Sequence, residues 1–352
     1  MVTLPGETAS DAKLVERLVA AGMDCARINC AHDDAPAWRA MAEHIRRAEK
    51  RVGRGCKICF DLAGPKVRTL AILLPEPDHR IKVGDLILLA KEIELENSGF
   101  PVQFTCTIPA VMRRLEAGTP VWINDGKIGC IVEKRTDSHA VLRVTHARPK
   151  GERLRAEKGL NFPTVSLPTA SLTHDDLVNL AEVARMADMI GFSFVRQAQD
   201  VVDLQNALTE AGRPSLPLVL KIETAQAVAN LPELIVAAAR RNPAAVMIAR
   251  GDLAVEIEYR RLAEIQEEML WLCEAAHVPV IWATEVLDRF IKDGKPSRAE
   301  FTDAAASGRA DCVMLNKGPF LPEAIGVLSD VLIRMEAHQS KKTSLLRALK
   351  TW

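Results

Sequence analysis

The stretch LVLKIETAQAVANLPELIVAAARRNPAAVMIARGD, residues 218–252, decides the fold. It contains two short runs rich in β-branched and apolar residues, LVLKIE at 218–223 and AVMIAR at 245–250, with a longer segment between them. Two strands joined by a helix-length crossover lie parallel in one sheet, because the crossover returns the chain to the end where the first strand began. The fold therefore depends on how often this unit repeats.

Six more runs of the same kind occur along the chain. They are VTLP (2–5), CARIN (25–29), ICFD (58–61), MIGFSF (189–194), PVIWAT (279–284) and CVMLN (312–316). Between the runs, apolar residues recur at helical spacing in the segments 9–21, 36–51, 173–187, 198–211 and 263–276. Eight strands separated by helices predict an α/β protein, a parallel (β/α)8 TIM barrel. A doubly wound sheet is the alternative, although neither GxGxxG nor GxxxxGKS follows an early strand.

The helical spacing disappears between residues 69 and 158. Turn signals (PEPDH, NSGFP, NDGK) alternate there with runs such as DLILLA, PVWIND, GCIVEK and AVLRVTHA. We therefore predict a small, barrel-like β domain inserted after the third strand. The predicted division is a barrel at 1–69 and 159–340, the insert at 70–158 and a tail at 341–352. Because such barrels carry their active sites at the carboxyl ends of the strands, the insert is placed to act as a lid.

The tail itself has an amphipathic pattern. Leu345, Leu346 and Leu349 recur at helical spacing within SKKTSLLRALKTW, residues 340–352. This spacing predicts a short helix that covers the barrel, or alternatively a partner.

The composition describes a globular protein and names no macromolecular partner. Of 352 residues, 48% are apolar, and the 46 basic residues balance the 46 acidic ones, so we expect neither nucleic acid nor an anionic membrane as a partner. With no signal peptide and no apolar run of about 18 residues, we expect a soluble, cytoplasmic protein. The eight cysteines are scattered, which favours buried, reduced thiols over disulfides. The pair Cys56 and Cys59 has no second pair to complete a zinc site.

Acidic and basic residues gather where two neighbouring strands end. Lys221 and Glu223 are two positions apart in a strand and therefore share a face. Asp252 follows the next run by two residues, so it opens into the same mouth of the barrel. Two carboxylates with room for substrate and water suit Mg²⁺ or Mn²⁺. The alternative is a purely structural salt bridge between Lys221 and Glu223.

Other strand ends also carry polar side chains. They supply Arg27 and Asn29, then Asp61 with Arg68 on the following segment, and Thr284. Two arginines, a lysine and a metal together describe a site for a small anion that carries both a phosphate and a carboxylate.

These residues lie in motifs that resemble the pyruvate kinase family along nearly the full chain. The motifs, in the family's order, are GMDCARINCAHD, FDLAGPKVRT, VWINDGKIG, EKGLNFP, SFVRQAQDV, KIET, MIARGDLAVEI, PVIWATEVLDRFIKDGKPSRAE and ADCVML. The resemblance implies a metal-dependent transferase that moves a phosphoryl group from phosphoenolpyruvate to ADP, giving pyruvate and ATP.

The resemblance also implies roles for the residues at the strand ends. Lys221 would neutralise charge beside the transferring phosphoryl group, and Glu223 and Asp252 would hold the divalent metal. The backbone amides of Gly251 and Asp252 would bind the substrate carboxylate. Thr284 would contact the substrate and help to deliver the proton to the enolate.

Further positions match the family's phosphate, cation and nucleotide contacts. Arg27 matches the arginine on the phosphoryl group. Asn29 and Asp61 match ligands of the monovalent cation. Arg68, His32 and Lys158 match the nucleotide side of the site, and Ser193, Phe194 and Arg196 match the fourth-strand motif.

Three departures from the family concern the monovalent cation. Ala31 and Leu62 replace a serine and a threonine that contribute oxygen ligands, and Lys66 replaces the usual glutamate after Gly-Pro. A fixed ammonium can replace the charge of a potassium ion. We therefore expect a potassium-independent site in which Lys66 supplies that charge; a plain loop lysine is the alternative.

Other departures concern the acceptor and regulation. Residues 316–319 (NKGP) replace a Ser-Gly-Glu-Thr loop on the nucleotide side, and Ala63 replaces a lysine, which leaves the acceptor open. The chain as given ends at Trp352, so we expect no regulatory C-terminal domain and no sugar-phosphate effector.

Two other functions remain open at this point. A metal-dependent aldolase acting on pyruvate or another oxo acid would use the same barrel, but it would not need Lys221. A sensor that binds phosphoenolpyruvate without turnover would fit the altered loop at 316–319. Family members pair through their barrels, so a homo-oligomer is compatible with each of these functions.

Overall fold

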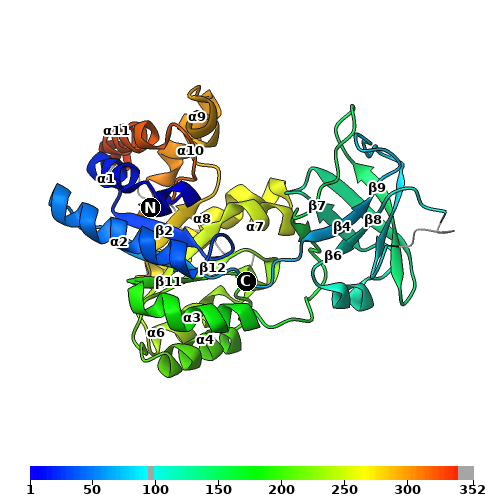
Figure 1. Ribbon diagram of the computed structural model, residues 1–352, viewed down its shortest axis with the longest axis horizontal. Coiled ribbons are helices and arrows are strands. Elements are labelled where there is room, and N and C mark those ends of the chain that lie inside the picture. Colours follow the sequence, from blue (N-terminus) through cyan, green and yellow to red (C-terminus); the bar gives the residue numbers. More distant parts are fainter. Residues whose placement is uncertain (94–98, 340–352) are drawn as a thin grey trace. The chain divides into compact units, whose positions relative to one another are not determined.

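The computed structural model describes residues 1–93 and 99–339, with side chains to Glu336. The chain forms two compact units (Figure 1). The first consists of Met1–Gly64, Ser171–Leu253 and the residues from Arg260 onward, and the second of Pro65–Ala170 with Ala254–Tyr259. The predicted tail helix lies outside the described residues. The exact domain boundaries stay a prediction: a barrel at 1–69 and 159–340, and an insert at 70–158.

The first unit is a parallel barrel, as the repeated strand and helix pattern predicted. Its strands are β1 (Val2–Thr3), β2 (Cys25–Asn29), β3 (Lys57–Asp61), β11 (Met189–Phe192), β12 (Leu218–Ile222), β13 (Ala244–Ala249), β14 (Val280–Ala283) and β15 (Cys312–Val313). They are hydrogen-bonded in this order, each parallel to the next. A parallel bridge between Val2 and Leu315 joins the first strand to the last. The doubly wound alternative is therefore wrong, because its strand order would reverse and leave open edges.

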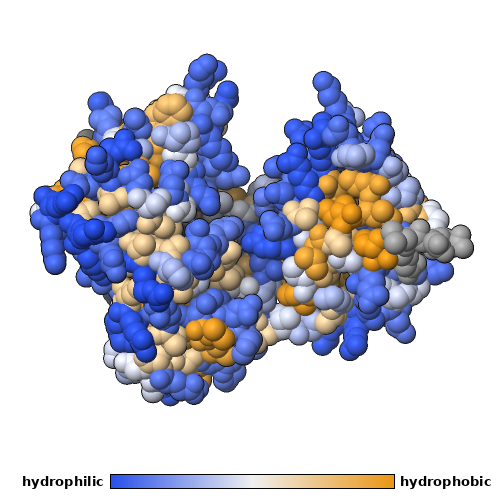
Figure 2. Space-filling model, in the orientation of Figure 1, coloured by the Kyte–Doolittle hydropathy of each residue, from blue (hydrophilic) through white to orange (hydrophobic). Residues whose placement is uncertain are grey.

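Helices surround the barrel strands (Figure 1). They are α1 (Ala12–Ala21), α2 (Ala35–Val52), α3 (His174–Met186), α4 (Ala198–Glu210), α5 (Ala225–Ala229), α6 (Leu231–Ala239), α7 (Arg250–Glu256), α8 (Leu262–Ala275), α9 (Asp288–Asp293), α10 (Arg298–Ser307) and α11 (Leu321–Gln339), with short 3-10 turns at Gly6–Ala9 and Tyr259–Arg261. On the face seen in Figure 2, hydrophilic residues cover much of the surface, with smaller hydrophobic areas between them. None of the helices in the described ranges is long and apolar enough to cross a bilayer.

Local sequence explains where several of these helices begin and end. Thr173 and Ser297 cap α3 and α10 with capping boxes that involve Asp176 and Glu300. Such caps satisfy backbone amides that have no partner inside the helix, and each contributes about 1 kcal/mol. Gly22, with φ +116°, ends α1 in the left-handed conformation that glycine adopts without strain.

The interior of the barrel is layered. A buried layer inside the barrel is rich in sulfur and includes Met1, Cys25, Cys59, Val219, Met247, Ile281 and Met314. Residues i and i+2 of a strand point to the same side, and the inward residue two positions after the apolar layer is polar in several strands. Arg27 follows Cys25 in this way, and Asp61 follows Cys59. The polar layer thus rests on a packed apolar floor. All eight cysteines are free thiols and seven are buried, which confirms the expectation from their positions.

The second unit is a nearly closed β barrel. Its strands, in hydrogen-bonded order, are β10 (Leu160–Asn161), β7 (Pro120–Ile123), β8 (Ile128–Arg135), β9 (His139–His146), β5 (Leu86–Ala90), β6 (Gln103–Cys106) and β4 (Thr69–Leu73), with a 3-10 turn at Pro109–Arg114. Buried residues such as Ile87, Phe104 and Leu142 form its core. The strands of this unit all lie between β3 and β11 in the chain, so the prediction of an inserted, barrel-like β domain after the third strand is confirmed.

Candidate active site

Lys221 forms the centre of a buried polar cluster at the carboxyl end of β12. Its Nζ lies 2.7 Å from Ser193 Oγ, 3.1 Å from Asp61 Oδ2 and 3.3 Å from Glu223 Oε1. Lys221 and Glu223 are only 7% and 4% exposed, and Asp61 is 1% exposed. Strand alternation brings these side chains inward together, since Lys221 and Glu223 are separated by one residue and Asp61 ends β3.

Arg27 completes the ion-pair network from β2. Its Nε donates to Asp61 Oδ2 at 2.7 Å, its Nη2 pairs with the same oxygen, and its Nη1 donates to Thr3 Oγ1 at 3.0 Å. Burial alone would raise the pKa of Asp61, but Arg27 and Lys221 outweigh burial and hold that pKa below its usual value. Burial would likewise lower the pKa of Lys221, yet Asp61 and Glu223 raise it. Both groups are therefore charged at neutral pH.

Glu223 has a different electrostatic environment. Its Oε2 accepts a hydrogen bond of 2.7 Å from the backbone amide of Phe194, whose φ is +54°. Burial raises the pKa of Glu223; the charge of Lys221 opposes this, while the charges of Asp252 and Asp61 raise the pKa further. Two carboxylates that repel each other in a buried setting favour a cation between them.

The donor set fits a hard divalent ion. Glu223 and Asp252 supply carboxylate oxygens from adjacent strand ends, and Mg²⁺ typically takes one or two carboxylates and completes its shell with water and substrate oxygens. In the described part of the chain, no cluster of three or more His, Cys, Asp or Glu side chains is arranged to hold a metal.

Gly251 allows a close approach of two strand ends. A Cβ built on Gly251 would lie 2.9 Å from Thr284 Cγ2, closer than real Cβ contacts occur. Thr284 therefore packs directly over Gly251, the residue that precedes Asp252 in the chain. Thr284 has φ +73°, a left-handed conformation uncommon for a β-branched residue. Residues held in this way carry about 1–3 kcal/mol of strain, and they are concentrated at functional sites.

Asn29 and His32 lie beside a cavity of about 350 Å³ at the same end of the barrel. Arg27, Asn29, His32, Asp288, Lys292, Asn316 and Lys317 are among the residues that line it. The Oδ1 of Asn29 accepts a hydrogen bond of 3.1 Å from the amide of Ala31, and the carbonyl of His32 accepts one of 3.0 Å from Trp38 Nε1. The altered loop after β15 thus faces the cavity that His32 lines.

Lys66, Arg68 and Lys158 belong to the second unit. They lie on two paired segments there, because Arg68 and Gly159 form an antiparallel bridge. The Nη1 of Arg68 donates to the carbonyl of Glu157 at 3.2 Å, and a Cβ on Gly159 would lie 2.9 Å from Lys66 Cε. These three cations are thus neighbours within the second unit.

Sequence reasoning missed some members of the cluster. The strand motif gives Ser193 and Phe194 no role, yet the Ser193 hydroxyl accepts from Lys221 and the Phe194 amide donates to Glu223. Thr3, which accepts from Arg27, also belongs to the cluster. Its position in the sequence could have indicated this, because Thr3 lies at the end of its strand, and Arg27 and Asp61 also lie at or near the ends of theirs. The hydrogen bond from an amide has no sequence signature.

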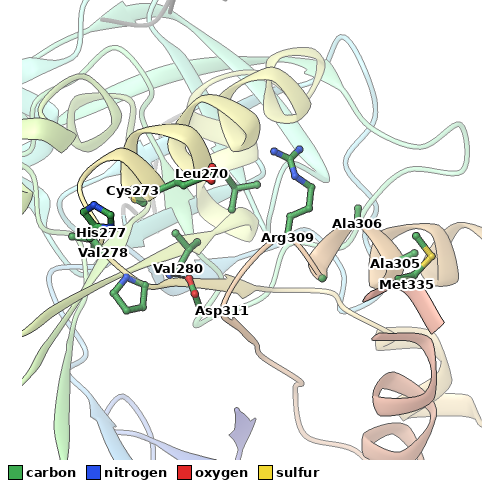
Figure 3. A pocket seen from close by; sticks show the side chains of 13 residues that line it. Leu270, Cys273, His277, Val278, Val280, Ala305, Ala306, Arg309, Asp311 and Met335 are labelled. Carbon is green, nitrogen blue, oxygen red and sulfur yellow. Dashed lines mark hydrogen bonds between the residues drawn. The ribbon is translucent and has the colours of Figure 1, made fainter. Parts of the chain in front are cut away.

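A second cavity, of about 860 Å³, lies at the opposite end of the barrel (Figure 3). Cys273 and His277 near the end of α8, Arg309 and Asp311 beyond α10, and Met335 of α11 are among its lining residues. The Oδ2 of Asp311 accepts a hydrogen bond of 2.7 Å from the amide of Val280. Asp311 therefore serves to order the start of β14, and this cavity lacks the buried charge network around Lys221.

Comparisons with known proteins identify similar sequences. A family model described as "Pyruvate kinase, barrel domain" matches residues 1–319. Similar curated proteins include the pyruvate kinases of Geobacillus stearothermophilus (31% identical over 92% of this chain and 54% of its own length), Staphylococcus saprophyticus (29%, over 97% and 57%) and Bacillus licheniformis (27%, over 97% and 57%). The chain thus spans just over half the length of these relatives.

Proposed function

We propose, on the premise that this chain belongs to the pyruvate kinase family, that it is a phosphotransferase that moves a phosphoryl group from phosphoenolpyruvate to ADP. The products would be pyruvate and ATP, and the setting would be glycolysis in the cytoplasm. The observation that carries the proposal is the buried cluster of Lys221, Glu223 and Asp61 with Arg27 at the carboxyl ends of the barrel strands. Asp252 and Thr284 lie at the neighbouring strand ends.

Each residue of the cluster has a role that its environment supports. Lys221, whose pKa is raised, stays protonated and acts as a fixed positive charge beside the phosphoryl group and the developing enolate. Arg27 presents a planar guanidinium, held by Asp61 and Thr3, to the phosphoryl oxygens. The amides of Gly251 and Asp252 bind the carboxylate, and Thr284 contacts the substrate at the carbon that becomes protonated.

Glu223 and Asp252 would hold Mg²⁺ or Mn²⁺. When bound, the ion supplies Lewis-acid stabilisation of negative charge on the phosphoryl and enolate oxygens. The raised pKa of Glu223 and the charge of Asp252 beside it support a cation at this position.

We extend the proposal to independence from potassium. Asn29 and Asp61 occupy the positions that match ligands of the monovalent cation in the family. Here Asn29 Oδ1 accepts from the Ala31 amide, and Asp61 Oδ2 accepts from both Arg27 and Lys221. These bonds leave less oxygen for a potassium ion, and Lys66 would supply the missing charge. The support is the set of substitutions Ala31, Leu62 and Lys66.

His32 and the 316–319 loop would contact the nucleotide acceptor, since His32, Asn316 and Lys317 line the cavity of about 350 Å³. Arg68 and Lys158 match the family's nucleotide contacts and would bind its phosphates. ADP is the proposed acceptor.

A coupled assay with phosphoenolpyruvate, ADP and Mg²⁺ tests the proposal. We expect pyruvate and ATP at enzymatic rates, and loss of at least about 100-fold in kcat for Lys221→Met, since removing one electrostatic stabiliser typically has that effect. Binding of phosphoenolpyruvate without turnover would identify a sensor instead. Cleavage of a 4-hydroxy-2-oxo acid would identify an aldolase. Light scattering on the same sample would show whether the chain forms a homo-oligomer.

A further inference from the structure

The turn after β14 is held in an unusual backbone conformation. Thr284, Glu285 and Leu287 have φ values of +73°, +60° and +49°. None of the three is glycine, and left-handed backbone is uncommon for residues that carry a side chain. Three such residues within four positions require support from elsewhere in the fold.

Arg250 supplies contacts to this turn. Its Nε donates to the carbonyl of Ala283 at 2.8 Å, and its Nη2 donates to the carbonyl of Thr284. The guanidinium also lies over the ring of Trp282, 4.7 Å from the ring centroid. Two consecutive carbonyls of the turn are thus bound by one rigid, planar group.

Asp303 of α10 fixes that guanidinium. Arg250 Nη2 donates to Asp303 Oδ2 at 2.9 Å, and Nη1 pairs with Oδ1, so the contact is bidentate. The Arg250 side chain is only 11% exposed. A partly buried, bidentate pair of this kind orients both partners more strictly than a single-contact surface pair does.

The position of Arg250 in the chain gives this arrangement its consequence. Gly251 follows it directly, and Thr284 Cγ2 would lie 2.9 Å from a Cβ on Gly251. Arg250 thus ties the end of β13 to the turn after β14 at the point where Thr284 packs over Gly251. Arg250 itself points away from the barrel interior, over Trp282.

We propose that Arg250, oriented by Asp303, is a positioning residue that holds Thr284 and Glu285 in their left-handed conformation and so sets Thr284 over Gly251 and Asp252. Its kinetic consequence rests on the function proposed above; its structural consequence does not. Arg250 acts through the Thr284 backbone and does not itself touch the substrate.

Crystal structures of four proteins test the structural part. Arg250→Lys keeps the charge but loses the fork, and Asp303→Asn leaves the guanidinium without its anchor. Arg213→Lys is the matched control, because Arg213 also donates to two carbonyls, those of Ala184 and Ala187, elsewhere in the barrel unit. We expect Thr284, Glu285 and Leu287 to leave the left-handed conformation, or to occupy more than one, in the first two variants and to stay as in the wild type in the control.

A double-mutant cycle tests the kinetic part with phosphoenolpyruvate, ADP and Mg²⁺. We expect Arg250→Lys to lower kcat by about 10-fold or more, and to have little further effect in a Thr284→Ala background, because both changes remove the same positioned hydroxyl. We also expect millimolar guanidinium to restore activity to Arg250→Ala, while equal concentrations of sodium chloride do not. A residue that only stabilised the fold would give additive effects.

The outcomes separate this inference from the proposed function. An unchanged turn in Arg250→Lys and Asp303→Asn overturns the inference, and so do additive effects in the cycle. A wild type without turnover overturns the proposed function, and the crystal structures then decide the role of Arg250 by themselves. If Arg250→Lys fails to fold, Asp303→Asn carries the same structural and kinetic comparison.

Discussion

Asp61 Oδ2 lies 3.1 Å from Lys221 Nζ, with both groups almost entirely removed from water. The same oxygen binds the guanidinium of Arg27. One carboxylate therefore balances two cations beneath the proposed substrate site. The stability of the barrel and the charge of the site both depend on Asp61.

Replacing Asp61 by asparagine should strongly destabilise the barrel unit. The substitution leaves Arg27 and Lys221 as two buried cations with one anionic partner fewer, and breaking such a buried pair costs about 3–5 kcal/mol of unfolding free energy. Urea denaturation at pH 7 would measure this. Asp137→Asn is the control: Asp137 pairs with Arg135 at 3.8 Å but is fully exposed, so its loss should leave the unfolding free energy nearly unchanged. Equal effects of the two substitutions would contradict the prediction.

The contribution of Asp61 should depend on pH with a definite sign. Arg27 and Lys221 hold the pKa of Asp61 below its usual value in the folded protein. The stabilisation is therefore present above the unfolded pKa of about 3.9 and is lost as pH falls through the lower, folded pKa. We expect the difference in unfolding free energy between wild type and Asp61→Asn to be constant from pH 7 to 5 and to shrink below about pH 4. A difference that shrinks first above pH 5 would rule out this assignment.

Removal of either proposed metal ligand should abolish stabilisation by Mg²⁺. Ligand at about 100 times its Kd adds about 2.7 kcal/mol to the stability of the folded state. Thermal unfolding with and without Mg²⁺ should show a rise in Tm for the wild type and little or none for Glu223→Gln or Asp252→Asn. Glu264→Gln, which removes an exposed carboxylate paired with Arg261 at 2.8 Å, should keep the full rise. A rise in Tm that survives both ligand substitutions would place the ion elsewhere.

Gly251→Ala should damage the site, and a second substitution should repair it. The new Cβ would meet Thr284 Cγ2 at 2.9 Å, so we expect at least about a 10-fold loss of kcat/KM and a destabilisation of about 1–3 kcal/mol, typical of overpacking. Serine lacks that methyl group, so Gly251→Ala with Thr284→Ser should recover most of the stability. Gly326→Ala is the control, because nothing lies within 4 Å of its added Cβ and alanine favours the helix. A double variant as unstable as Gly251→Ala would exclude the contact as the cause.

Activity should not require potassium. We expect rates in tetramethylammonium chloride within about two-fold of those in potassium chloride, because fixed cations can supply the charge that the ion provides elsewhere. Lys66→Glu should introduce potassium dependence. Lys127→Glu, a charge reversal at an exposed position of the same unit, should not. A wild type that is inactive without potassium would refute this prediction.

Local patterns in the sequence were enough for the architecture and for placing Lys221 and Glu223 at one strand end. Strand alternation placed Lys221 and Glu223 on one face, and the switch from helical to alternating spacing near residue 69 located the inserted β domain. These patterns depend on backbone geometry over a few residues, which neighbouring residues report directly. The order of strands followed from the repeated crossover, whose handedness and short connections leave few arrangements.

The sequence by itself thus determined that this chain forms a (β/α)8 barrel with an inserted β unit and which strand ends carry its polar side chains. Only the tertiary structure decided which of those side chains meet. Asp61 binds both Arg27 and Lys221, Ser193 accepts from Lys221, and Arg250 reaches across to Thr284 and Asp303. Such pairings join residues tens to more than a hundred positions apart. They depend on how strands pack around a common axis, and no local spacing encodes that packing.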